Sequence, residues 1–182
     1  AFNFTDNIEA PNSFTLQDPS ATLKTFENVP AGESYLITEL DTPGWPLTAL
    51  SCTTGSSDYN ASLTNGFVSV DNLTADDTVA CTFTSTMCQP GNYDDGGNEC
   101  VEAAAGHYVD TAAATASIPC SPGSYQPDTG QSSCLLADPG FYVDVSGSAV
   151  QFACPVGTTS GPGATACTPV GEIIYLPVVM RP

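Results

Sequence analysis

Residues 21–40 decide the fold: Ala21-Thr-Leu-Lys-Thr-Phe26, then Val29-Pro-Ala-Gly32, then Ser34-Tyr-Leu-Ile-Thr-Glu-Leu40. The first segment alternates apolar and polar residues, which is typical of a strand with one buried face. Pro and Gly make the second segment a turn. We interpret the third segment as a strand, so this stretch predicts two β-strands joined by a turn.

Further strand segments lie on both sides of this stretch. Ser13–Leu16 alternates in the same way, and the later segments are Trp45–Cys52, Gly66–Val70 and Thr78–Thr84. No segment shows a helical period. Six or seven short strands at close spacing predict an all-β fold with a two-sheet sandwich over residues 1–87.

Cys52 and Cys81 are the only cysteines of this half, and each lies in a predicted strand. We expect a disulfide between them. It would close a loop of about 29 residues and stabilise the sandwich by roughly 3–4 kcal/mol.

Four motifs stand out in this half: Thr25-Phe-Glu-Asn-Val-Pro-Ala-Gly-Glu-Ser-Tyr-Leu-Ile-Thr-Glu39, Pro43-Gly-Trp45, Leu50-Ser-Cys52 and Val79-Ala-Cys-Thr-Phe83. With them, residues 1–87 resemble bacterial prealbumin-like domains, the transthyretin-shaped or Cna-B-type sandwiches of surface adhesins and pilus shafts. The resemblance implies a stalk, spacer or pilin body.

Two departures from these relatives matter. Relatives usually begin with a hydrophobic strand before their Phe-x-Phe segment, whereas this sequence starts directly at Ala1-Phe-Asn-Phe4. The resemblance therefore implies that one strand is missing. Some relatives also form a Lys–Asn isopeptide bond beside an acid that Glu39 would match. We do not expect that crosslink, because the only lysine, Lys24, lies in a different strand.

The second half is a tandem repeat. Its pattern is Cys-x-x-Gly-x-Tyr, closed by a second cysteine 12 to 14 residues after the first. Two cysteine-free units are interleaved and begin at Ala103 and Ala137. Unit starts at residues 103, 120, 137 and 154 are 17 residues apart, so five units fill residues 88–170.

In the cysteine-free units both cysteine positions are replaced together. The replacing residues are Ala103 and Ser117 in one unit and Ala137 and Gln151 in the other. Joint loss is expected when each bridge joins the two ends of one unit, since a bridge between neighbouring units would leave an unpaired thiol. We therefore predict bridges of roughly 3 kcal/mol each: Cys88–Cys100, Cys120–Cys134 and Cys154–Cys167.

With this pattern, residues 88–167 are similar to the cysteine-rich repeats of ephrin-receptor ectodomains. That resemblance implies an extended, disulfide-stapled module rather than an enzyme.

A hydrophobic strand ends the sequence at residues 171–182, Gly-Glu-Ile-Ile-Tyr-Leu-Pro-Val-Val-Met-Arg-Pro. Its apolar side chains would face both sides of a strand, which must then be buried on both sides. The tail packs either on its own repeats or in the sandwich of another subunit. We favour insertion, because the sandwich lacks a strand and a head-to-tail contact yields a filament. The predicted assembly residues are Ile173, Ile174, Tyr175, Leu176, Val178, Val179 and Met180.

Composition restricts the function further. The chain has 20 acidic and 2 basic residues, a net charge of −18. Such a chain lacks the clustered cations of nucleic-acid binding and does not favour an anionic membrane surface. No window of about 18 apolar residues predicts a membrane span.

Several features indicate an oxidising, extracellular compartment. Eight cysteines form an even set. Sequons at Asn3, Asn60 and Asn72 are candidate N-glycosylation sites. We interpret Ala1 as the start of a mature secreted chain after signal cleavage.

Catalysis is not expected, and neither is a cofactor or metal. All cysteines are assigned to bridges, which leaves no thiolate nucleophile or zinc ligand. His107, the sole histidine, is interpreted as a surface or packing residue. The acidic run Asp94–Glu99 lacks the spacing of an EF-hand and is interpreted as a solvated turn, as is Asp76-Asp77.

Together these patterns predict a structural subunit of an extracellular or cell-surface, pilus-like filament. Its domains would be a sandwich at 1–87, repeats at 88–170 and a strand at 171–182, and its partners would be identical subunits. The alternative is a monomeric cell-surface adhesin or ligand-binding stalk. The sequence does not define the filament symmetry, the glycans or the surface that is bound.

Overall fold

A computed structural model describes residues 2–8, 13–16, 24–26, 29–55 and 57–171 of the chain. In this part of the chain the secondary structure is β-strand, with no helix and therefore none that could cross a membrane. The structure confirms the predicted all-β class. It forms two compact units: Ala1–Ala103 with Val109–Ser117, and Ala104–Tyr108 with Ile118–Pro182. The first repeat therefore lies in the same unit as the sandwich, while the division at residue 87 stays a prediction.

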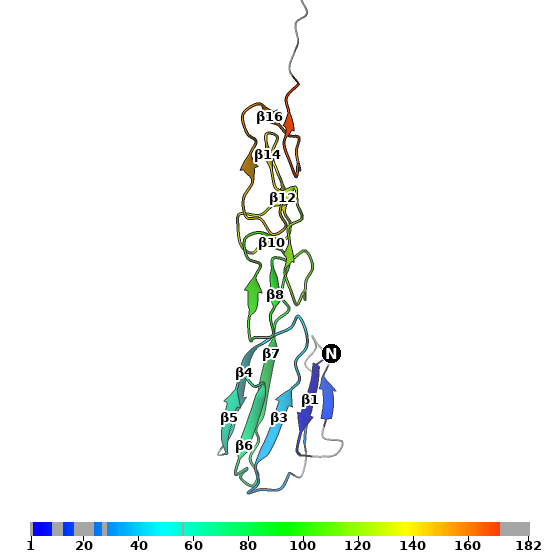
Figure 1. Ribbon diagram of the computed structural model, residues 1–182. Helices are drawn as coiled ribbons and strands as arrows, with labels where there is room; N and C mark the ends of the chain where they lie inside the picture. Colours follow the sequence, from blue (N-terminus) through cyan, green and yellow to red (C-terminus); the bar gives the residue numbers. More distant parts are fainter. Residues whose placement is uncertain (1, 9–12, 17–23, 27–28, 56, 172–182) are drawn as a thin grey trace, which may run out of the picture. The chain divides into compact units, whose positions relative to one another are not determined.

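Two antiparallel sheets build the sandwich (Figure 1). The larger has the strand order β2-β1-β3-β6-β5, and the smaller pairs β4 with β7. The strands are β1 (Phe2–Asp6), β2 (Ser13–Leu16), β3 (Tyr35–Glu39), β4 (Leu47–Thr53), β5 (Asp58–Ser62), β6 (Phe67–Asp71) and β7 (Ala80–Ser85).

Five of the predicted strands occur close to their expected positions, as β2, β3, β4, β6 and β7. The predicted strand at 21–26 does not extend over residues 24–26, which have no regular structure, and residues 21–23 lie outside the described part. Strands β1 and β5 were not predicted. β4 begins at Leu47 rather than Trp45, and Pro46 just before it has no amide hydrogen to give to a sheet.

A small core holds the sheets together. Val68 and Val70 of β6 are buried against Cys52 of β4, with Leu50, Ala61, Leu73, Val79, Cys81 and Phe83 packed around them. Cys52 and Cys81 are directly paired across β4 and β7 and form a disulfide. This core is centred on β4, β6 and β7, and Phe4 of β1 is also buried, against Phe83.

Each repeat contains a short hairpin. In the first unit β8 (Asn92–Asp94) pairs with β9 (Cys100–Glu102). In the second unit the pairs are β10 (His107–Tyr108) with β11 (Ile118–Pro119), β12 (Ser124–Tyr125) with β13 (Leu135–Leu136), β14 (Phe141–Tyr142) with β15 (Phe152–Ala153), and β16 (Thr158–Thr159) with β17 (Thr168–Pro169). The structure places a disulfide within each cysteine-bearing repeat: Cys88–Cys100, Cys120–Cys134 and Cys154–Cys167.

A glycine in each repeat links it to the next. In the second unit the amides of Gly106 and Gly123 donate to the carbonyls of Gln126 and Val143. Their own carbonyls accept hydrogen bonds from the first residues of the following repeats, Cys120 and Ala137. These glycines have φ near +84° and +88°, which residues with a Cβ adopt only at a cost. The repeats thus stack as in a solenoid, where each contacts mainly its neighbours.

Within the first unit, hydrogen bonds of the same kind join the sandwich to the first repeat. Cys88 donates its amide to the carbonyl of Gly44, just as Ala103 donates to Gly91 one repeat later. The amide of Gly44 donates to a carboxylate oxygen of Asp94 at 2.9 Å. Asp94 is only 4% exposed and its other oxygen accepts from Gly96, so the interpretation of the whole 94–99 run as a solvated turn is wrong at Asp94. Its carboxylate instead joins the sandwich to the first repeat.

Candidate assembly groove

An inter-sheet groove opens on the side of the sandwich where the core is thin. It is a cavity of about 750 Å³ between the inner faces of the two sheets. That volume lies within the range of binding clefts that take up several apolar groups. The apolar residues that line it are Phe4, Ile8, Leu16, Phe26, Val29, Ile37, Val70, Leu73, Val79 and Phe83.

The groove lies beside a strand edge. Among the described strands, β7 pairs only with β4, on one of its two edges. Within the described residues the larger sheet has five strands and the smaller two. An unpaired edge next to an apolar cavity is a template for one more strand.

Aromatic rings form the floor of the inter-sheet groove. Phe4 of β1 and Phe83 of β7 lie edge to face, with ring centroids 5.3 Å apart. Ile37 of β3 lines the same floor and is half-buried. Phe4 is already buried, so the apolar surface left to a further strand belongs to Ile37 and Phe83, which are half-buried, and its burial would contribute about 25 cal/mol per Å².

Charged residues lie at the rim. Lys24 lines the groove with its Nζ 4.8 Å from the centre of the Phe26 ring. The loop before β7 brings Asp76 and Asp77 to the rim. Asp77 accepts hydrogen bonds from the amides of Gly55 and Ser57 at 2.8 and 2.7 Å, and so fixes this loop to the loop before β5. The predicted turn at Asp76-Asp77 is therefore an ordered rim of the groove.

A second, more polar cavity of about 270 Å³ lies in the same unit, with Glu39, Trp45 and Asn98 in its wall. Glu39 accepts a hydrogen bond from the Ser85 hydroxyl at 2.9 Å, while its Oε2 is buried without a hydrogen-bond partner. Burial raises the pKa of Glu39; the Ser85 hydrogen bond opposes this shift and the charge of Asp41 adds to it. Lys24 is in the wall of the other cavity, so Glu39 and the only lysine line different cavities.

This burial predicts a pH-dependent effect of Glu39→Gln. Because the folded-state pKa of Glu39 is raised, the folded chain binds its proton more tightly than the unfolded chain does, and stability falls as pH rises through the ordinary pKa towards the raised one. Gln cannot ionise. We expect Glu39→Gln to raise the melting temperature at pH 7 and to change it little at pH 4, measured by thermal unfolding of both proteins. Equal shifts at the two pH values would contradict this assignment.

The other predicted site residues lie apart from the groove. Asn3, Asn60 and Asn72 are all exposed, on β1, on β5 and after β6. His107 is half-buried in β10, and no group of metal-ligating side chains occurs among the described residues. The predicted assembly residues 173–180 lie outside the described part of the chain.

Three residues whose hydrogen bonds fix the loops of the sandwich and the first repeat were not identified from the sequence: Gly44, Asp77 and Asp94. Pro43-Gly-Trp45 was noted only as a turn and a family motif. Nothing in the sequence connects Gly44 to Asp94, 50 residues away, because that contact depends on the tertiary fold.

Residues 1–87 match a family model described as a prealbumin-like fold domain. No curated protein matches the chain. The N-terminal half is therefore a prealbumin-like domain, while the likeness of the repeats to ephrin-receptor ectodomains stays a prediction. The disulfides of both halves fit an extracellular protein.

Proposed function

From a prealbumin-like domain at residues 1–87, we propose that this chain is the structural subunit of an extracellular, pilus-like filament. Domains of this kind suggest a pilin or surface-protein module. In our proposal, residues 173–180 of one subunit enter the inter-sheet groove of the next and pair with the open edge of β7. The contact is head-to-tail and does not close, so it continues into a polymer.

The observation that carries this proposal is the coincidence of an apolar groove with an edge of β7 that no other described strand pairs with. The composition of the tail suits insertion beside β7 over an apolar groove, because its run of apolar residues would present apolar side chains on both faces of a strand. One face of the tail would contact Ile37 and Phe83 in the floor of the groove.

The net negative charge of the subunits opposes their assembly, so we expect assembly to depend on the salt concentration. Each subunit carries a net charge of −18, so neighbouring subunits repel one another. Screening at higher ionic strength reduces this repulsion. In our proposal the repeats act as a spacer between successive sandwiches rather than as an enzyme.

The proposal predicts that deleting residues 172–182 abolishes polymerisation. The full chain should scatter light as a broad distribution of polymers that grow with salt, whereas the truncated chain should remain a monomer. Multi-angle light scattering after size-exclusion chromatography measures both. If the full chain is a stable 18.7 kDa monomer at every salt concentration, the filament proposal fails and the adhesin stalk takes its place.

A further inference from the structure

The turn between β5 and β6 carries a chemically labile pair of residues, Asn65-Gly66, which is the one Asn-Gly pair in the sequence. Asn65 is exposed, in the short loop between Ser62 and Phe67, which face each other across the two strands. Asn-Gly is favoured in hairpin turns. The pair is also open to attack by the backbone on the side-chain amide, because glycine has no side chain that hinders the approach.

We propose that Asn65 is a site of spontaneous deamidation in the folded chain. The amide nitrogen of Gly66 attacks Cγ of Asn65, and the bond from Cγ to Nδ2 breaks. Nδ2 leaves as ammonia and takes with it the proton of the Gly66 amide. Water then opens the cyclic imide at one of its two carbonyls, which leaves aspartate or isoaspartate at position 65. The only co-reactant is water.

The reacting groups are weakly held in the turn. The amide of Gly66 donates to the carbonyl of Leu63 at 3.2 Å, at the long end of the range for such bonds. Nδ2 of Asn65 donates to Oγ of Ser62 at 3.0 Å, in an exposed contact. Rotation of the Asn65 side chain exchanges this contact for water, so Cγ turns towards the Gly66 nitrogen at little cost.

The fold requires glycine at position 66 and so preserves the labile pair. Gly66 has φ of +62°, which residues with a Cβ adopt only at a cost. A Cβ there would lie 3.1 Å from the carbonyl oxygen of Glu39, whose amide donates to the carbonyl of Gly66 at 2.9 Å. A larger residue that would shield Asn65 is therefore disfavoured by the close approach of β3.

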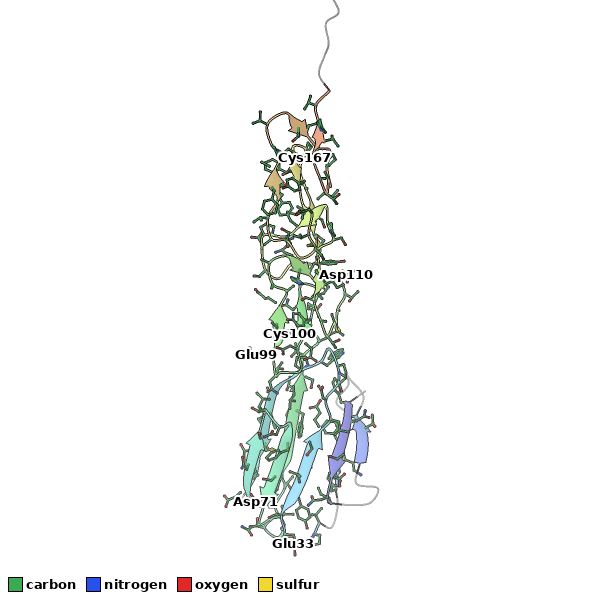
Figure 2. The ribbon with its side chains drawn as sticks, viewed as in Figure 1. Glu33, Asp71, Glu99, Cys100, Asp110 and Cys167 are labelled. Atoms are coloured by element: carbon green, nitrogen blue, oxygen red, sulfur yellow. A yellow bond between two sulfur atoms is a disulfide. The ribbon has the colours of Figure 1, made fainter. Side chains whose placement is uncertain are left out.

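The turn lies at the end of the sandwich that meets the first repeat. Nδ2 of Asn98 donates to the carbonyl of Leu63 at 2.9 Å. Figure 2 shows Asp71, the last residue of β6, at the end of the sandwich away from Glu99 of the same unit, so β6 begins at the end near Glu99. Isoaspartate carries the chain through its side-chain carbon and adds an atom to the backbone of the turn. This longer path disturbs the contact between Leu63 and Asn98.

Deamidation also changes the charge of the polar cavity. Asn65 lies in the wall of this cavity together with Glu39 and Asp41. Both products replace a neutral amide with a third carboxylate in the same wall, and like charges repel one another. We therefore expect the melting temperature of the chain to fall as Asn65 is converted.

Peptide mapping of the full chain, kept folded at mildly alkaline pH, tests the proposal. Asn60 and Asn72 are the internal controls, because both are exposed in the same unit but are followed by Ala61 and Leu73. After reduction and digestion with chymotrypsin, mass spectrometry should show loss of the Asn65 amide while Asn60 and Asn72 keep theirs. Methylation by an isoaspartyl methyltransferase should label the same fragment.

The matched variant is Asn65→Gln, whose attack on Gly66 would need a larger and slower-forming ring. Its melting temperature should stay constant over the same period, whereas that of the unmodified chain should fall. The proposal is overturned if Asn65 keeps its amide as long as Asn60 and Asn72 do. It is equally overturned if Asn65 loses its amide in denaturant but not in the folded chain, because the turn would then protect it.

Discussion

We expect Ile37→Asp to abolish the proposed polymerisation of the full chain, whereas Leu36→Asp at the neighbouring position of β3 should leave it intact. Ile37 lies in the floor of the inter-sheet groove, and Leu36 is 41% exposed on the opposite face of the same strand. A carboxylate at position 37 would have to leave water when a tail enters the groove, and burying an unpaired charge is strongly unfavourable. At position 36 the carboxylate stays in water. Light scattering of the two variants at equal salt measures the difference.

The control for the Ile37→Asp and Leu36→Asp variants is a test that the sandwich still folds. Each variant must keep the Cys52–Cys81 disulfide and a cooperative thermal transition, and this is measured for both because Ile37 pairs with buried Val68 whereas Leu36 pairs with Ser69. Polymers of unchanged length from folded Ile37→Asp would show that the groove does not take part in assembly.

Gly106→Ala destabilises the repeats far more than Gly140→Ala. Both glycines have φ of +84°, so both substitutions carry the same backbone cost of about 1–2 kcal/mol. A Cβ on Gly106 would also overlap the carbonyl of Gly147, while a Cβ on Gly140 would meet nothing within 4 Å. Relief of that overlap requires the second repeat to move away from the fourth, which also weakens the hydrogen bond from Gly106 to Gln126 of the third repeat.

Calorimetry of the two variants separates the backbone cost from the packing cost. We expect the melting temperature of Gly106→Ala to fall several degrees further than that of Gly140→Ala. Equal losses would mean that the repeats are not packed closely enough at Gly106 for a methyl group to matter.

Sequence periodicity predicted the parts of this fold that are local. Alternating residues and Pro-Gly turns identified five of the sandwich strands, because burial of one strand face leaves a period of two in the sequence. The 17-residue period identified the tandem units, each of which contains a hairpin in the structure. β5 was missed because it is an edge strand, Asp58-Tyr-Asn-Ala-Ser62, with little buried surface and hence no alternation.

The inter-sheet groove and the Gly44–Asp94 contact between the sandwich and the first repeat could not be predicted from the sequence, because both depend on contacts between distant residues. The family resemblance implied a missing strand, but only the fold brings Phe4 against Phe83 and leaves β7 with an unpaired edge among the described strands. Asp94 sits in a Gly-rich acidic run that is typical of a solvated turn. Its burial depends on Gly44, which no local pattern relates to it.

The filament account is tested most directly by mixing two variants that should not polymerise alone. The truncated chain without residues 172–182 keeps a groove but has no tail, and full-length Ile37→Asp keeps its tail but has an impaired groove. Light scattering of the mixture should give a one-to-one dimer and nothing larger, because one tail can enter one groove and no further contact is possible. A mixture that contains only monomers, although full-length unmodified chain polymerises, would contradict insertion of the tail into the groove.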